Sequence, residues 1–271
     1  MPSGSAAGPV VPATVSAVRP VGAYDAVSLS VPSSADWDRA RPGQLVVLPG
    51  DPVHGAVLPD VHWLADVSVD PVHGTTIQLV VPADARPVGD EVVLLGPLGR
   101  GFPLPSQAVP ALVVAHERSA APVRWLASLL RGRGCTVHVV LSADDPDRHL
   151  DPGGLRRTAD SVVLTRPEGL PAELTSRLDD PATDPTLVLA TGPRDLVRVV
   201  ASLAAPRGRV VRVAALDPDT GAVCGTGVCG CCDLAVDDGA GGRRVRPCLE
   251  GPVLPGEWLL SARSEARRAA R

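Results

Sequence analysis

Thiol side chains crowd a short stretch near the C-terminus, where four of the six cysteines lie within nine residues, in the sequence CGTGVCGCC from 224 to 232. Cys224, Cys229 and Cys232 follow the spacing C-x4-C-x2-C, and Cys248 follows sixteen residues later. Three close thiolates with a distant fourth are typical ligands of a [2Fe–2S] cluster. Glycines between the cysteines permit the left-handed backbone that turns amides toward the cluster sulfurs. The pattern therefore predicts a [2Fe–2S] site formed by these four cysteines.

Two other uses of the thiols stay open. Structural zinc also takes four cysteines, but usually from two C-x2–4-C pairs, and here a lone Cys248 replaces the second pair. The thiols could also be uncommitted. Cys231 is the spare residue, because ligation by both Cys231 and Cys232 would strain the backbone between them. We expect Cys231 to lie beside the cluster or to be free, and an exchange of roles with Cys232 is the alternative.

Composition limits the classes of function. The chain has 271 residues, 45% of them apolar, which indicates about two globular domains with aliphatic cores. The formal net charge is −4 and no basic stripe is present, which argues against nucleic acid as a partner. No apolar run is long enough to span a membrane and no secretory leader is visible. Because crowded cysteines do not resemble a disulfide framework, we expect a cytoplasmic protein.

Short apolar runs with alternating polarity fill the first hundred residues and are separated by proline, glycine, aspartate and serine. Their spacing predicts an antiparallel β-barrel in residues 1–104. The expected strands are 10–18, 26–31, 44–49, 64–70, 75–81 and 91–96.

The pattern changes after residue 104. Compact apolar runs typical of buried parallel strands alternate with helical segments, which predicts a Rossmann-like α/β domain in residues 105–216. Strands are expected at 111–116, 135–143, 161–167, 186–192 and 209–216, and helices at 121–134 and 193–205. Residues 217–271 are expected to form the cluster-binding tail. The fold class is thus mixed: an antiparallel barrel, an α/β domain and a [2Fe–2S] tail.

The tail resembles the cluster domain of the electron transfer subunit of type B dihydroorotate dehydrogenase, a family of the ferredoxin–NADP reductase-like superfamily. That family has C-G-x-G-x-C-x-x-C followed by C-x-x-G-P-V-[FL], which CGTGVCGCC and CLEGPVL (248–254) match. The stretches PGQLVVL (42–48), VGDEVVLLGPLGRGFPLP (88–105) and TLVLATGPRDLVRVVA (186–201) also resemble it. The resemblance implies transfer of electrons from NADH to FAD, through the cluster, to an FMN in a partner dehydrogenase subunit of a hetero-oligomer.

Three departures concern the flavin and nucleotide sites. His62 and Ala65 stand where the family has the Arg and Ser/Thr of its flavin motif, and neutral histidine does not replace a bidentate cation. The loop in LVVPADARPVGDEV (79–92) lacks the family's phosphate-binding glycines. The glycine-rich turn after the first α/β strand reads AHERSAAP (115–122), where Glu117 would repel a phosphate. We therefore expect FAD and NAD(H) binding to be weakened or lost, and assign no cofactor-binding residue.

His116, Glu117 and Arg118 lie together after a predicted strand, where α/β domains often bind ligands. A solvated turn that replaces the glycine loop is the favoured interpretation, and an acid–base group is the alternative. We predict no catalytic residue elsewhere. The expected function is an iron–sulfur electron-transfer subunit that serves a flavin-containing dehydrogenase or reductase. A redox-inactive scaffold with zinc or a structural cluster, and a complete NADH:FAD:[2Fe–2S] reductase subunit, stay open.

Overall fold

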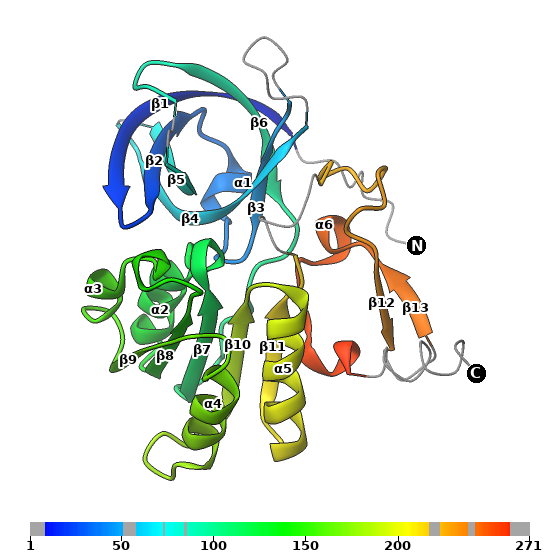
Figure 1. Cartoon of the computed structure of the whole chain (residues 1–271). Coiled ribbons are helices and arrows are strands. Elements are labelled where there is room, and N and C mark those ends of the chain that lie inside the picture. The colour runs from blue at the N-terminus through cyan, green and yellow to red at the C-terminus, as the bar shows by residue number, and fades with distance from the viewer. Residues whose placement is uncertain are drawn as a thin grey trace.

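The protein consists of a β-barrel, an α/β domain beside it and a small C-terminal segment that contacts both (Figure 1). The computed structural model describes residues 9–50, 58–72, 74–83, 86–216, 223–237 and 242–260. The barrel is closed and antiparallel, with the strand order β1-β2-β5-β4-β3-β6, which confirms the predicted architecture. Its strands are β1 (Val10–Val21), β2 (Tyr24–Val31), β3 (Leu45–Leu48), β4 (Asp60–Asp70), β5 (Gly74–Pro82) and β6 (Glu91–Leu98).

The barrel wall is apolar on its inner face and on the part of its outer face that meets the α/β domain. One alternate set of side chains, which includes Leu29, Leu64 and Ile77, forms the barrel's own core. The short helix α1 (Ala35–Asp38) adds Trp37 to this core, where it is 2% exposed. The opposite set, which includes Trp63, packs against the α/β domain. The barrel and the α/β domain therefore share a continuous apolar interface, as period-two alternation allows.

The α/β domain contains a six-stranded sheet in the order β14-β11-β10-β7-β8-β9, of which β7 to β11 are parallel. The predicted α/β domain is confirmed, and α4 is a helix that was not predicted. The strands are β7 (Pro110–His116), β8 (Thr136–Ser142), β9 (Ser161–Thr165), β10 (Leu187–Thr191) and β11 (Val210–Ala214). The helices are α2 (Val123–Gly132), α3 (Pro152–Leu155), α4 (Leu170–Asp179) and α5 (Arg194–Ala204).

The direction in which successive strands are added to this sheet reverses between the adjacent parallel strands β7 and β10. From β7 the chain continues through α2 to β8 on one side, whereas from β10 it continues through α5 to β11 on the other. Residue 116 ends β7 and residue 191 ends β10, and the two strands are in register with Ala115 opposite Thr191. Their carboxyl ends form the topological switch point at which open α/β sheets bind ligands.

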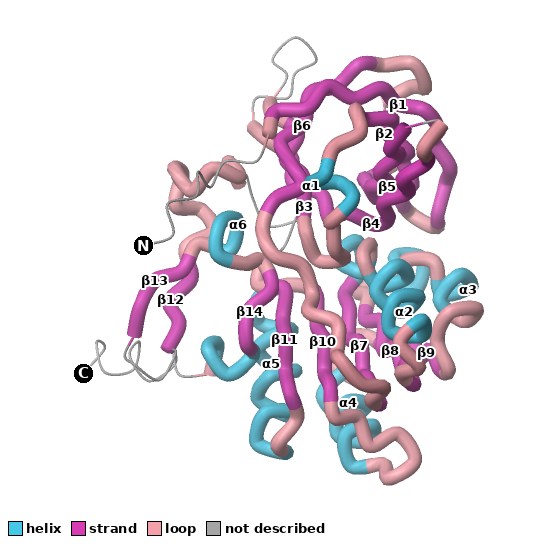
Figure 2. The backbone as a smooth tube through the Cα atoms, turned by 180° about the vertical axis from the view of Figure 1, so that it is seen from behind, coloured by secondary structure: helices cyan, strands magenta, loops and turns pink. Residues whose placement is uncertain are grey.

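The C-terminal segment is attached to both larger parts. A hairpin of β12 (Leu234–Asp237) and β13 (Gly242–Val245) leads into α6 (Pro247–Glu250). The chain then forms β14 (Val253–Pro255), which lies antiparallel to β11 at one side of the α/β sheet (Figure 2). A 3-10 helix, η5 (Gly256–Leu259), follows β14. An isolated bridge joins Arg100, after the barrel, to Pro252. No helix in the described ranges is long and apolar enough to cross a membrane.

Asp160 links α2 and β8 through its carboxylate. One oxygen accepts the backbone N–H of Val137 at 2.7 Å, and the other accepts Nη1 of Arg131 at 2.6 Å. The hydrogen bond from Val137 and then that from Arg131 lower the pKa of Asp160, although burial acts the other way. A carboxyl group with a pKa lower in the folded than in the unfolded protein contributes stability above its unfolded pKa, and this is lost as the pH falls through the folded pKa.

We expect Asp160→Asn to lower the free energy of unfolding by about 1 kcal/mol at pH 7, because the carboxylate is a third exposed and its charged hydrogen bonds are partly screened. The deficit should shrink as the pH is lowered below about 5. Urea unfolding at a series of pH values measures it. Asp195→Asn is the control, since that ion-paired carboxylate is 92% exposed. A deficit that grows toward acid pH would contradict the assignment.

Candidate metal centre

The cysteine loop is held between the barrel and α6 by close backbone packing. Gly225 has φ +71, and a Cβ built on it would lie 2.8 Å from Leu98 Cδ1 and 3.0 Å from Val47 Cγ2 of the barrel wall. Gly227 has φ +73, and its Cβ would overlap Leu249 Cδ1. Both the backbone conformation and the space at these two positions therefore require glycine.

The sulfur atoms face backbone and side-chain donors. Cys224 Sγ accepts the backbone N–H groups of Thr226 and Cys229, each at 3.4 Å, and the Thr226 hydroxyl at 3.2 Å. Cys229 Sγ accepts the backbone N–H of residue 231 at 3.4 Å. Cys232, at the end of the cysteine loop, and Cys248, in α6, have their Sγ atoms 3.2 Å apart. Cys224 and Cys229 thus accept hydrogen bonds from backbone N–H groups of the loop, whereas Cys232 and Cys248 contact each other.

Two of these thiols ionise easily. Burial acts to raise the pKa of Cys224, but the hydrogen bonds from Thr226 and Cys229 outweigh it and lower the pKa to about 6. The hydrogen bond from the Cys248 thiol lowers the pKa of Cys232 to about 6, while the pKa of Cys248 is raised by sharing its proton with Cys232. The thiolate is the form of cysteine that binds metal.

The donor set fits a [2Fe–2S] cluster. Four thiols are available and N–H groups point at two of the sulfurs, which is how proteins stabilise the charge of such clusters. Cys231 is exposed, and its Sγ is 3.9 Å from the carbonyl oxygen of Cys229. The assignment of Cys224, Cys229, Cys232 and Cys248 as ligands, with Cys231 as the spare thiol, stays a prediction.

The position of the expected flavin motif is filled by the protein's own charged groups. The ring of His62 is 2% exposed, and its Nδ1 accepts Nη1 of Arg118 at 3.2 Å. Its Nε2 donates to Asp60 Oδ2 at 3.0 Å. Ala65, further along β4, lines a crevice of about 40 Å³ with Ala120 and other residues of both domains. Ligand sites for drug-sized molecules usually have roughly 300–1,000 Å³, so the crevice at Ala65 is too small for a flavin. His62 lines a separate cavity of about 290 Å³ in the barrel, together with Asp60 and Arg86.

The turn after β7 is a 3-10 helix, η2 (Glu117–Ala120), and all four of its residues are buried. The prediction of a solvated turn is therefore wrong. The reason is that Glu117 finds partners far along the chain: its Oε1 accepts the N–H of Asp144 at 3.0 Å, and its Oε2 lies 2.7 Å from Arg148 Nη2. With both oxygens paired, burial of the carboxylate is tolerated.

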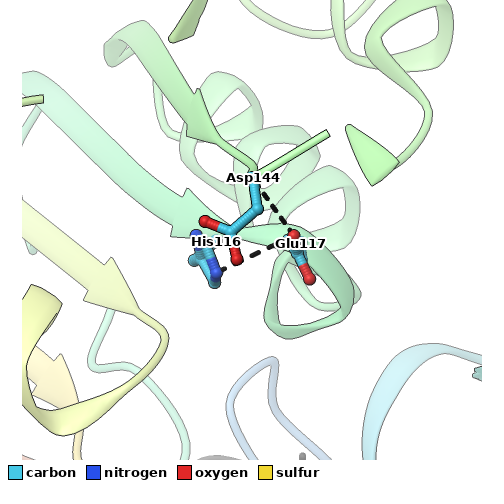
Figure 3. Close-up of side chains that lie close together, drawn as sticks. All are labelled: His116, Glu117 and Asp144. Atoms are coloured by element: carbon cyan, nitrogen blue, oxygen red, sulfur yellow. Dashed lines mark hydrogen bonds and ion pairs between the residues drawn. The ribbon is translucent and has the colours of Figure 1, made fainter. Parts of the chain in front are cut away.

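His116, Glu117 and Asp144 place one ligand atom each within 4.8 Å of one another (Figure 3). Nδ1 of His116 lies 3.4 Å from Ser142 Oγ, and its Nε2 lies 4.0 Å from Glu117 Oε1. Arg118 does not join this group, because its side chain contacts His62 in the barrel. The predicted neighbours 116 to 118 therefore do not act as one unit. No local sequence signal pointed to Asp144 or Arg148, which lie 27 and 31 residues beyond Glu117.

Comparison with known proteins agrees with this geometry. No family model matches the chain. The structure of the NADH-dependent reduced ferredoxin–NADP oxidoreductase, associated with flavin-based electron bifurcation, is similar with a TM-score of 0.72 and 20% identity, over 96% of this chain and 93% of the other. The ferredoxin reductase of carbazole 1,9a-dioxygenase is similar with a TM-score of 0.59 and 17% identity, over 74% and 66% of the two chains.

The chain thus has a ferredoxin reductase-like fold with a cysteine-rich C-terminal segment. More particularly, its curated homologues are electron transfer subunits of dihydroorotate dehydrogenase B (NAD(+)). The subunit of Desulforamulus reducens is 30% identical over 179 residues, 64% of this chain and 66% of the relative. That of Shouchella clausii is 28% identical over 187 residues, 65% and 68% of the two. The chain thus spans about two thirds of the length of these relatives, and the resemblance noted in the sequence is confirmed.

Proposed function

We propose that the protein is an iron–sulfur electron-transfer subunit. Cys224, Cys229, Cys232 and Cys248 would hold a [2Fe–2S] cluster, which accepts and releases one electron at a time. The observation that supports this most directly is the set of N–H groups directed at Cys224 Sγ and Cys229 Sγ. Such donors offset negative charge on sulfur and so favour the reduced state.

The exposure of the loop suits exchange of electrons with another protein. Cys232 and Cys248 are buried, whereas Cys229 is exposed and Val228, beside it, is 85% exposed. The site is therefore closed on the side of the barrel and α6 and open at the tip of the loop. A partner that covers this tip would bring its own redox group close to the thiolates and exclude water from between them.

The partner we propose is a flavin-containing dehydrogenase or reductase subunit that carries FMN, in a hetero-oligomer. The names of the relatives support this, because they describe an electron transfer subunit of a dehydrogenase. Their substrate is not carried over to this chain. In this proposal the four cysteines bind the cluster, and the exposed tip of the loop at Val228 and Cys229 faces the partner.

The test is the visible spectrum and metal content of protein purified without oxygen. We expect broad visible absorption that bleaches with dithionite, and iron with inorganic sulfide in equal amounts. Colourless protein with one zinc ion per chain would exclude the proposal and favour the redox-inactive scaffold. Cluster reduction by NADH, with FAD released on heating, would instead favour the complete reductase subunit.

A further inference from the structure

The turn η2 closes the switch point of the α/β sheet. A ligand bound outside the carboxyl ends of β7 and β10 would lie against this turn. The Thr191 hydroxyl, at the end of β10, donates a hydrogen bond to the carbonyl oxygen of Ser119 in the turn. A Cβ built on Gly192 would lie 3.1 Å from Cβ of His116. The chain that leaves β7 is therefore fastened across the end of β10, where a ligand would enter.

Glu117 places a carboxylate at the switch point, in the turn that follows β7. Its side chain is 5% exposed, and it takes the N–H of Asp144 and the guanidinium of Arg148, donors of the kind that bind a phosphate. Glu117 also has φ +43, a conformation that is rare for residues other than glycine. The Glu117 carboxylate thus occupies the N–H of Asp144 and the guanidinium of Arg148, which an anionic ligand at the switch point would need as donors.

Arg118 extends in the other direction, toward the barrel. Its guanidinium is buried, 4% exposed, and binds His62, which in turn binds Asp60. Two neighbouring residues of one turn therefore satisfy charged or polar groups in both domains. The crevice left between the domains beside Ala65 and Ala120 measures about 40 Å³.

We propose that the turn Glu117–Ala120 is a built-in substitute for a bound dinucleotide, with Glu117 in the place of a phosphate and Arg118 anchored in the barrel. It follows that this chain takes no NAD(H) at the switch point and no FAD between the barrel and the α/β domain, where Arg118 binds His62. Electrons then reach and leave the cluster only through redox groups of partner proteins. The inference rests on the proposed function, which identifies the redox group as a [2Fe–2S] cluster. It also distinguishes the electron source of this chain from that of relatives whose name includes NAD(+).

The same residues invite a different interpretation, a metal ion held by His116, Glu117 and Asp144 (Figure 3). The contact with Arg148 at 2.7 Å argues against it, because a guanidinium already neutralises the carboxylate that would bind the cation. Metal binding is therefore an outcome that would overturn the proposal.

The experiment uses the full chain with its cluster and measures binding of NADH, FAD and inorganic pyrophosphate by calorimetry. Wild type should bind none of them with saturation at millimolar concentration. Glu117→Gly removes the carboxylate and suits a positive φ, and it should bind pyrophosphate at least tenfold more tightly than wild type. Glu117→Gln keeps the size of the side chain and should give a smaller gain, which covers the case that the glycine variant does not fold. Glu173→Gln is the matched control. Glu173 Oε1 forms an ion pair with Arg177 Nε at 2.7 Å within α4, outside the switch point.

Several results would overturn the proposal: NADH binding or retained FAD in wild type, pyrophosphate binding that is the same in the Glu117 variants and wild type, or Mn²⁺ or Zn²⁺ binding that is lost in Asp144→Asn. The visible spectrum is recorded on the same samples. A missing cluster contradicts the proposed function, whereas nucleotide binding by protein with an intact spectrum contradicts only this inference.

Discussion

Replacement of Cys248 by alanine is expected to abolish the visible absorption of the protein, with iron and sulfide falling to background. Cys248 is buried in α6 and its Sγ lies 3.2 Å from Cys232 Sγ, so it is placed to close the coordination from the side opposite the loop. Without it, a cluster iron would have one ligand fewer. Anaerobic purification with spectroscopy and iron analysis measures the loss.

The matched control is Cys231→Ala, in the same loop. Cys231 is exposed, and its Sγ lies 3.9 Å from the carbonyl oxygen of Cys229. Its replacement should leave the spectrum and the iron content unchanged. Loss of colour in Cys231→Ala with colour retained in Cys232→Ala would show that the two neighbours exchange roles.

A methyl group added to Gly225 is expected to release the cluster even though all four cysteines remain. Alanine at φ +71 costs roughly 1–2 kcal/mol in backbone strain. The added Cβ also meets Leu98 Cδ1 at 2.8 Å and Val47 Cγ2 at 3.0 Å, so the loop must move away from the barrel. Overpacking of this kind costs about 1–3 kcal/mol more. We expect Gly225→Ala to lose its iron to a chelator at least tenfold faster than wild type.

Gly208→Ala separates strain from packing. Gly208 has φ +72, almost the conformation of Gly225, but no atom lies within 4 Å of a Cβ built on it. It should lower the stability of the α/β domain by about 1 kcal/mol and leave the rate of iron loss unchanged. Equal rates of iron loss in the two variants would mean that the contact with the barrel does not hold the loop.

Much of the fold follows from local patterns. The barrel strands are recognisable because alternate residues such as Val27, Leu29 and Val31 face one core, and the parallel strands because both of their faces are apolar. A signal for α4 was also present, since Leu170, Leu174 and Leu178 repeat every four residues and are all buried. In contrast, β14 has only three residues, the last of them a proline, and only its pairing with β11 makes it a strand.

The cysteine loop is recognisable from the sequence for a related reason, because the spacing of its thiols is local and glycines stand between them. The turn at Glu117 is different. A glutamate among alanine, serine and arginine predicts exposure, and only the folded chain shows that Arg148 and the N–H of Asp144 reach it. Burial of a charge depends on partners that are distant in sequence, so local patterns do not predict it.

The position of β14 has a consequence for the whole chain. Its pairing with β11, from Arg212 opposite Pro255 to Ala214 opposite Val253, covers the open N–H and C=O groups of the last parallel strand. A chain shortened before the cysteine loop would leave β11 as an unprotected edge strand, a template for self-association and aggregation. The segment that carries the thiols therefore also protects an edge of the α/β sheet, so a truncation that removes the candidate metal centre would expose that edge as well.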